Sequence, residues 1–593
     1  MKIIQVHSKL NIYLILFVIL LVIVLPPSTA KISCSKVSSA LKKEKSVEYN
    51  DLKKCLESFP FNATLATETV DAVLHFLSSY YVFFDRAKEE PPSGFTYQPV
   101  DLKNELNSIR KKQFNSDYDF SGFNYDQGLH LYSVVKTDKN KKKKQVFDDI
   151  VDSSNNDCEV IKIGGKSALQ AIIDFANGTI QYSKDLNVRF NMALAPSQPI
   201  IQRHIFQQFN LREDFPETSS IKYQLTCPKK GSVSLERKWI ITHEDGFGGF
   251  SLNCLEQDNK PTFSLNENFA SSDKATKLTS RDKITNSTLN NDPKIAHAQM
   301  IDDGSLYLLN DGSKTGVVII SVERVKDENH LKNDFQKLKK HGAKKIILDM
   351  SNNPGGDITF SIFLTSILFS SKQPNSFPTD IIINDFTIPK IEKNFKKNST
   401  DPEDYDVYNP KFFLSFPFGK PFNSSGDFIG TRKNRTSNLY LNTLTLDENK
   451  LLKNVSFPWT NDDIIIITNG FCASACALIT LYLSEIHKVK TIAVGGLFED
   501  QMSFSTYPSG EVSSSNDIAD YAGDNITNIP GINSLSLTVR EAYSFDENKN
   551  VKDVLEYSYK PADCRLYYDE KNVRDPSLLW LEASKILNNE VKC

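Results

Sequence analysis

A serine stands where an apolar strand gives way to an apolar helix. The segment Ile464–Tyr482 has the sequence IIIITNGFCASACALITLY, with Ser474 in the first turn of the expected helix. The isoleucine run is typical of a strand buried on both faces of a parallel sheet, and Asn469-Gly470 predicts the turn that ends it. Unpaired N–H groups at a helix N-terminus favour developing negative charge, so Ser474 is a candidate nucleophile for acyl transfer. The alternative is that Ser474 only caps the helix.

A second strand-turn-helix unit precedes this one. Residues 345–350 (KIILDM) predict another buried strand, and the sequence SNNPGG then leads into an apolar run that is typical of a helix. The Gly355-Gly356 pair lets backbone come close to a ligand and offers N–H groups to an oxyanion. A glycine-rich turn that serves only packing is the alternative for this unit alone. Together with Ser474, the pair favours an acyl-transfer site.

These two motifs resemble those of the tail-specific (C-terminal-processing) serine peptidases, especially the branch that includes chlamydial protease-like activity factor and its secreted fungal homologues. The resemblance covers roughly residues 31–120 and 155–593. It implies an α/β fold with a ClpP/crotonase-like catalytic domain, an N-terminal helical region and an inserted PDZ-like module. It also implies an oxyanion hole formed by the N–H of Ala475 and one N–H from Gly355 or Gly356.

The family places a glutamate downstream of the serine, at the end of a strand, where it orients the catalytic histidine. The best local match is Glu547, in the run EAYSFDENKN that begins at residue 541. Asp546, Glu541 and Glu556 remain rivals for this role. The alternative for Glu547 is a solvated loop carboxylate without a catalytic role.

The catalytic histidine is where this chain departs from the family pattern. Family members carry it in a short Asp-x-His motif after the helical region, and none of the nine histidines here lies in such a motif. His130 is in the expected interval, but its surroundings predict a strand, so a structural histidine is the alternative. His243 or His487 would have to be brought in by folding. A serine-lysine dyad would need a lysine where the chain has Glu499.

Three functions are compatible with these observations. The first is a secreted serine endopeptidase with Ser474 as nucleophile, Glu547 as the orienting acid and His130, or another histidine, as base. The second is a catalytically inactive homologue that binds peptides through its PDZ-like module and vacant cleft. The third is an acyl-CoA enzyme of the crotonase type, which a secretory route disfavours because its substrate is intracellular. No metal or other cofactor is implied.

The N-terminus predicts secretion. Lys2 and Lys9 precede an apolar run from Ile12 to Leu25, and a short segment ending at Ala30 follows, as in a cleaved signal peptide. The run is shorter than the about 20 residues of a membrane-spanning helix. We therefore expect an extracellular protein with no stable membrane span after cleavage.

Composition and cysteine number agree with this class of protein. A chain of 593 residues needs several domains, and its hydrophobic fraction of 40% is ordinary for a globular protein. A net charge of −3 gives no reason to expect nucleic-acid binding, so the expected partners are a peptide or protein substrate and, as a candidate, a second copy of the chain. Nine cysteines fit an oxidising compartment. Sequence does not determine their pairing; we single out Cys34 with Cys55, and Cys227 with Cys254.

The domain limits follow from changes in composition and periodicity. We expect a signal peptide at 1–30, an N-terminal helical region at 31–154, a PDZ-like module at 155–256, a linker at 257–310 and the peptidase domain at 311–593. In the helical region, Val70, Val73, Leu74 and Leu77 lie on one face of a predicted helix. The open strand edge of the PDZ-like module would accept a peptide, with an ordinary β-α unit as the alternative. The polar segment 396–460 predicts a surface insertion.

Overall fold

The structure is a computed structural model of the chain. It describes residues 34–37, 39–40, 46–58, 61–112, 123–135, 142–194, 208–212, 215–243, 295–302, 304–322, 328–369, 376–401, 405–430, 436–444, 446–498, 501–522, 529–530 and 535–593. The predicted signal peptide lies outside these residues. Within these ranges, no helix combines the length and the apolar character needed to cross a membrane.

One seven-stranded sheet carries both sequence motifs. Its order is β10-β11-β12-β13-β18-β19-β23, and the strands from β12 onward run parallel. The strands are β10 (Ala298–Asp302), β11 (Leu306–Leu309), β12 (Thr315–Ile319), β13 (Lys345–Asp349), β18 (Ile464–Thr468), β19 (Lys490–Val494) and β23 (Cys564–Leu566). β13 and β18 are neighbours. Because parallel strands end at the same edge of a sheet, the turns that follow β13 and β18 meet there.

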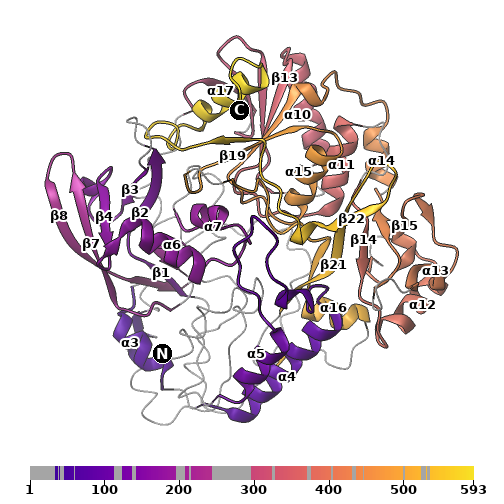
Figure 1. Ribbon diagram of the computed structural model, residues 1–593, viewed down its shortest axis with the longest axis horizontal. Helices are drawn as coiled ribbons and strands as arrows, with labels where there is room; N and C mark the ends of the chain where they lie inside the picture. Colours follow the sequence, from indigo (N-terminus) through magenta and orange to yellow (C-terminus); the bar gives the residue numbers. More distant parts are fainter. Residues whose placement is uncertain are drawn as a thin grey trace.

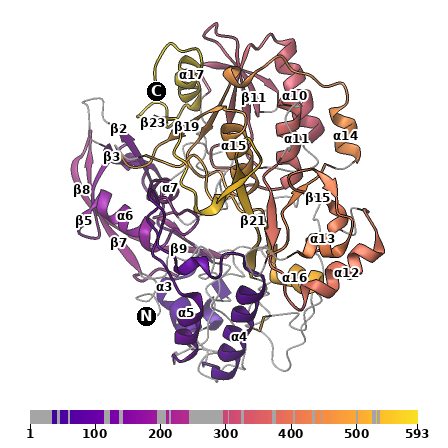
Figure 2. The same cartoon turned by 45° about the vertical axis from the view of Figure 1, so that its right-hand side comes forward.

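Helices cover both faces of this sheet (Figure 1, Figure 2). On one face lie α10 (Glu328–Lys340), α11 (Ile358–Leu368), α14 (Leu446–Leu452) and α15 (Ala475–Glu485), and on the other lies α17 (Pro576–Leu587). Ile464 and Ile466 of β18 belong to the core of the first group, whereas Ile465 and Ile467 pack in one core with Trp580 of α17. The predicted buried strands at 345–350 and 464–467 are confirmed, and burial on both faces explains their continuous apolar sequence.

A second seven-stranded sheet has the order β16-β15-β17-β14-β21-β20, with β22 paired to β21. Its strands are β14 (Thr379–Ile381), β15 (Phe413–Ser415), β16 (Lys420–Pro421), β17 (Tyr440–Asn442), β20 (Glu511–Ser514), β21 (Ser536–Phe545) and β22 (Val551–Val554). Its core includes residues of α4 (Ala63–Tyr80), α5 (Leu102–Arg110), α12 (Thr387–Lys397), α13 (Ser425–Ile429) and α16 (Ser515–Ala522). The predicted apolar helix face is confirmed, since Val73 and Leu77 of α4 share this core with Leu537 of β21. The predicted surface insertion at 396–460 is wrong, because this segment supplies β15, β16 and β17 and buries Tyr440 fully.

Residues 123–243 form two antiparallel sheets. The larger one has the order β2-β3-β4-β7-β8, with β5 on β4, and consists of β2 (Leu129–Val135), β3 (Lys142–Asp149), β4 (Glu159–Ile163), β5 (Lys166–Ser167), β7 (Ser220–Cys227) and β8 (Gly231–Lys238). We call this sheet, together with α6 (Ala168–Gly178) and α7 (Leu186–Met192), the sheet module. The smaller sheet contains β6 (Leu211–Arg212), β1 (Phe123–Asp126) and β9 (Ile240–His243), and it shares a core with α3 (Tyr49–Leu56).

The predicted domain limits and these structural units differ in two ranges. The range 31–154, expected to be helical, contains α3, α4 and α5 but also β1, β2 and β3, and the last two strands belong to the sheet module. The range 257–310, expected to be a linker, ends in β10 and β11 of the parallel sheet; its residues 257–294 lie outside the described ones. β2 and β3 continue into β4, and β10 and β11 continue into β12, so each set belongs to the sheet of the strand that follows it in the sequence, which local composition does not reveal.

Four disulfides join described cysteines. The predicted pair Cys34–Cys55 is confirmed. The predicted pair of Cys227 with Cys254 is wrong, because Cys227 bonds Cys158. Cys227 ends β7 and Cys158 precedes the neighbouring strand β4, so sheet pairing brings these two together. The other two bonds are Cys472–Cys476 and Cys564–Cys593.

Candidate active site

Ser474 occupies the turn between β18 and α15. Its backbone has φ 52° and ψ −122°, a left-handed conformation that costs a residue other than glycine about 1–3 kcal/mol. A strained strand-to-helix turn of this kind exposes the hydroxyl of a nucleophilic serine. Ser474 makes no side-chain cap hydrogen bond, and its backbone lacks the extended conformation of a capping residue. The geometry therefore disagrees with the cap interpretation and fits the nucleophile prediction.

The turn after β13 binds the Ser474 turn directly. The Asn353 N–H donates to the Phe471 carbonyl at 3.0 Å, and the Ala473 N–H donates to the Asn353 carbonyl at 2.9 Å. This pairing continues the parallel arrangement of β13 and β18 beyond the ends of both strands, with the register shifted by one residue. The two sequence motifs therefore form one continuous backbone surface.

A third loop binds the Ser474 turn as well. The Thr506 N–H donates to the Cys472 carbonyl at 2.8 Å, and the Ser474 N–H donates to the Tyr507 carbonyl at 3.0 Å. Ser474 and the three residues before it are thus fixed by backbone hydrogen bonds to two separate loops. Such over-determination is what keeps a strained conformation in place.

Gly355 lies in direct contact with the serine. Its φ is +95°, and a Cβ built on it would stand 2.5 Å from the Ala473 carbonyl oxygen, 2.7 Å from Ser474 Cβ and 3.1 Å from the Ala475 nitrogen. Real Cβ atoms essentially never approach other atoms as closely as the first two distances. The position therefore needs glycine for two reasons, its left-handed backbone and the space that Ser474 takes.

The structure distinguishes between the N–H groups of Gly355, Gly356 and Ala475, which were predicted as oxyanion donors. The Gly355 N–H donates to Asn353 Oδ1 at 2.8 Å, so the turn itself uses this group. Within the described part of the chain, the Ala475 N–H makes no hydrogen bond and stands beside Ser474 at the start of α15. Ala475 and Gly356 are therefore the donors that remain for an oxyanion, with Gly355 providing the close approach.

The structure does not join a histidine to Ser474 among the residues that it describes. His130 lies in β2 of the sheet module, where its Nε2 is 3.3 Å from Asp126 Oδ1. His487 stacks on Phe369 with ring centroids 4.2 Å apart, and His243 lies in β9. His130 agrees with the predicted strand position, and its catalytic role stays a prediction.

The four candidate carboxylates occupy different environments. Glu547 is exposed in the turn between β21 and β22, next to Asp546. Glu541 is buried, and its Oε1 lies 3.0 Å from Arg86 Nε. Glu556 is buried in an ion pair with Lys184, and burial raises the pKa of this carboxyl group. Glu541 and Glu556 thus already have cationic partners, and the predicted role of Glu547 stays a prediction.

Helix α7 of the sheet module holds the loops around Ser474, a feature that sequence reasoning missed. The Asn191 Nδ2 donates to the Asn469 carbonyl at 2.8 Å and to the Val494 carbonyl at 2.9 Å, while its Oδ1 accepts from the Gly496 N–H at 2.6 Å. One carboxamide thereby ties the ends of β18 and β19 together. No local signal marks Asn191 in the sequence, because its partners come from a different sheet.

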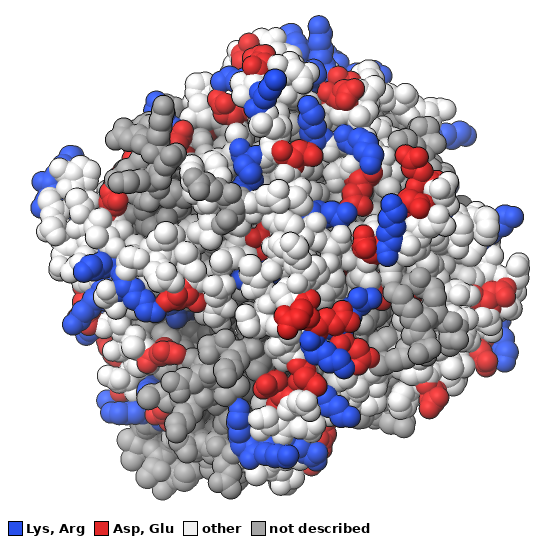
Figure 3. Space-filling model, in the orientation of Figure 1, with Lys and Arg blue, Asp and Glu red and all other residues white. Residues whose placement is uncertain are grey.

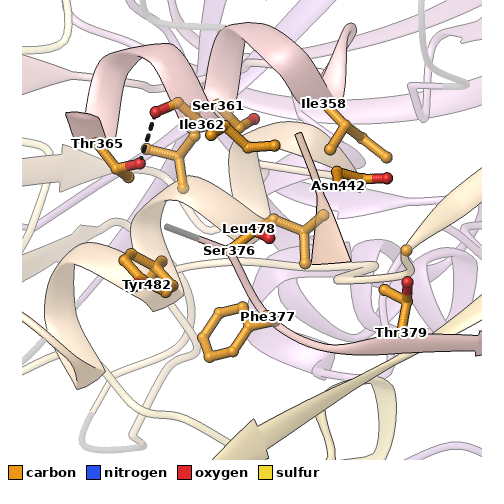
Figure 4. A pocket seen from close by; sticks show the side chains of 12 residues that line it. Ile358, Ser361, Ile362, Thr365, Ser376, Phe377, Thr379, Asn442, Leu478 and Tyr482 are labelled. Carbon is orange, nitrogen blue, oxygen red and sulfur yellow. Dashed lines mark hydrogen bonds between the residues drawn. The ribbon is translucent and has the colours of Figure 1, made fainter. Parts of the chain in front are cut away.

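A small pocket lies between α11 and α15 (Figure 4). It has a volume of about 20 Å³, enough for roughly one water molecule. Its lining includes Ile358 and Ile362 from α11, and Leu478 and Tyr482 from α15. Both helices start at the motifs described above, so this pocket lies between the helices that follow the Gly355 and Ser474 turns.

One group of described side chains has the composition of a metal site. Asp302, His330 and Asp334 could each direct one ligand atom to a common point. Lys337 already forms ion pairs with both carboxylates, at 3.3 Å from Asp334. Because the Lys337 ammonium group is already their cationic partner, we assign no metal to this group.

Fold and site together define a class of protein: an α/β fold in which a strained serine follows a buried parallel strand and faces a Gly-Gly turn from the neighbouring strand. No family model matches the chain. In sequence the chain is similar to the peptidase S41 family protein ustP of Aspergillus flavus, at 23% identity over 312 residues, or 44% of this chain. That match spans 64% of the relative's length, less than two thirds of it.

The fold is shared with CPAF. Mature CPAF has a TM-score of 0.53 at 14% identity, over 89% of this chain and 98% of CPAF. Mature CPAF complexed with lactacystin gives the same score and identity, over 99% of its own chain. The chain therefore resembles the tail-specific, or S41, peptidases, and within them the branch of CPAF.

Proposed function

We propose that this protein is a secreted serine endopeptidase of the tail-specific type that cleaves peptide bonds through Ser474. The observation that carries the proposal is the strained backbone of Ser474. This backbone lies against Gly355 and is held there by hydrogen bonds to two loops. The similarity to an S41 peptidase and the fold shared with CPAF support the proposal.

In the proposed reaction, Ser474 Oγ attacks the carbonyl carbon of the substrate and gives its proton to a general base. The N–H groups of Ala475 and Gly356 stabilise the oxyanion. Collapse of the tetrahedral intermediate breaks the C–N bond, and the leaving amine takes the proton from the base. Water then hydrolyses the acyl ester and restores the serine. His130 is the proposed base and Glu547 the proposed orienting carboxylate.

A fluorophosphonate probe tests the nucleophile. We expect the purified protein to be labelled on Ser474 and to hydrolyse unstructured peptides, and Ser474→Ala to abolish both. Ser484→Ala, on the same helix, is the matched control and should label like the unmodified protein. Labelling that persists in Ser474→Ala would refute the assignment.

An inactive, peptide-binding homologue is the second candidate function. It is favoured by one observation: Ser474 Oγ makes no hydrogen bond to any residue that the structure describes. In this case the probe would not react, and peptides would bind with an affinity that Ser474→Ala leaves unchanged. The edge strand β8, largely exposed along its length, is the place where such a peptide would add to a PDZ-like sheet.

The remaining parts of the proposal concern location and architecture. We propose that the parallel sheet is ClpP/crotonase-like, that the sheet module is PDZ-like and that the chain is exported. The charged side chains on the face in Figure 3 are of both signs and interspersed, which suits a peptide substrate better than a polyanion. Expression in a secreting host tests export: we expect medium-borne protein whose N-terminus lies close to residue 31. Retention of residues 1–30 would contradict it, and light scattering tests the proposed homodimer.

A further inference from the structure

A disulfide brackets the candidate nucleophile. Cys472 and Cys476 are four positions apart, with Ser474 midway between them, and both cysteines are fully buried. They belong to the core that α10, α11 and α15 form on one face of the parallel sheet. The bond thus closes a small covalent ring around the strained residue.

Stability alone does not explain a disulfide at this place. The gain from closing a loop increases with the number of residues in the loop. The sequence separations of the other disulfides are 21, 29 and 69, against 4 here. This bond therefore contributes the least to the stability of the whole fold, although it lies at the most constrained turn.

The Ser474 turn has no room to expand. Bonded sulfur atoms lie about 2 Å apart, whereas unbonded atoms in contact need roughly 3.5–4 Å. Separating two buried sulfurs in a close-packed core requires the turn to widen. Gly355 already lies against Ala473, Ser474 and Ala475, so it leaves little space around the turn. Widening therefore changes the distance between the serine and the predicted oxyanion donors.

We propose that the Cys472–Cys476 disulfide is a positioning element for Ser474, and that the serine reacts efficiently only while this bond is closed. The proposal rests on the function proposed above. Reduction by a dithiol transfers two electrons and two protons to the disulfide; the S–S bond breaks, two thiols form and the reductant becomes a cyclic disulfide. An oxidising compartment keeps the bond closed, so catalytic competence is tied to the redox state of the surroundings.

The test compares two double variants. Cys472→Ala/Cys476→Ala removes the ring, and the control Cys34→Ala/Cys55→Ala removes a disulfide in a different core, beside α3. We expect the first variant to lose at least about 100-fold in fluorophosphonate labelling rate and in kcat, with KM for a peptide substrate unchanged. We expect the control to keep its labelling rate but to unfold at a lower temperature. If the Cys472–Cys476 bond were merely structural, its removal would lower the unfolding temperature and leave the labelling rate unchanged.

Each outcome decides between the proposals. If the unmodified protein is not labelled, the proposed peptidase function fails. If the unmodified protein and Cys472→Ala/Cys476→Ala are labelled at equal rates, only the positioning proposal is overturned. If this double variant does not fold, the unmodified protein is reduced with a dithiol instead, and its labelling rate is followed while near-ultraviolet circular dichroism reports the fold. Loss of labelling in the folded, reduced protein and recovery on reoxidation support the proposal, and full labelling of that species refutes it.

Discussion

Gly355→Ala is the sharpest perturbation that the structure offers. The new Cβ would lie 2.5 Å from the Ala473 carbonyl oxygen and 2.7 Å from Ser474 Cβ, so these atoms must move by about 0.5–1 Å to reach ordinary contact. The left-handed backbone at φ +95° adds roughly 1–2 kcal/mol, and overpacking adds about 1–3 kcal/mol. We therefore expect a destabilisation of about 2–5 kcal/mol and, because a displacement near 1 Å misplaces the nucleophile, a loss of roughly 100-fold in labelling rate.

Gly342→Ala is the matched control for this prediction. Gly342 also has a positive φ, +77°, but a Cβ there meets nothing within 4 Å. This variant should lose only roughly 1–2 kcal/mol in stability, from the left-handed backbone of an alanine, and keep its labelling rate. Fluorophosphonate labelling and thermal unfolding of both variants are measured side by side. Equal labelling rates in Gly355→Ala and Gly342→Ala would refute the argument that Gly355 positions Ser474.

Two further predictions concern groups outside the serine turn. Asn191→Ala removes three hydrogen bonds to the loops after β18 and β19, so we expect a loss of about 2–4 kcal/mol in stability and slower labelling, measured by thermal unfolding and probe kinetics; unchanged labelling would show that α7 does not support the site. Burial, and next the neighbouring Glu448, raises the pKa of Glu328 from 4.5 to about 8. The folded state therefore keeps a proton that the unfolded chain releases, and stability falls as pH rises from about 4.5 to about 8. Glu328→Gln removes this loss, so the melting temperature of the variant, relative to that of the unmodified protein, should rise between pH 5 and pH 8. A melting-temperature difference that stays constant over this range would contradict the raised pKa.

The local parts of the site could be predicted from sequence because short-range physics determines them. Four consecutive isoleucines need cover on both faces, which is what the parallel sheet provides around β18. A Gly-Gly pair at a strand end implies close approach, and Gly355 touches Ser474. The sequence could not show that the Gly355 N–H is used by Asn353, because that depends on a side-chain rotamer.

The sequence-based predictions that were wrong concern contacts between distant segments. The segment 396–460 is polar enough for a surface insertion, yet its buried apolar residues, such as Tyr440, complete the core beneath β14 and β21. Cys158 and Cys227 pair because β4 and β7 are adjacent, and spacing carries no record of that adjacency. The docking of α7 through Asn191 is likewise invisible in a single sequence.

The loops that hold Ser474 come from distant parts of the chain, and this has a consequence for biosynthesis. The hydrogen bond from Asn191 to Asn469 joins residues 278 positions apart, and Asn353 and Tyr507 bind the turn from either side. Contacts of such long range form late in folding, because each needs a large loop to close first. We expect that a chain lacking any of these segments does not hold Ser474 in its strained conformation. Under the proposed function, reactivity toward peptides would then arise only after the whole chain has folded.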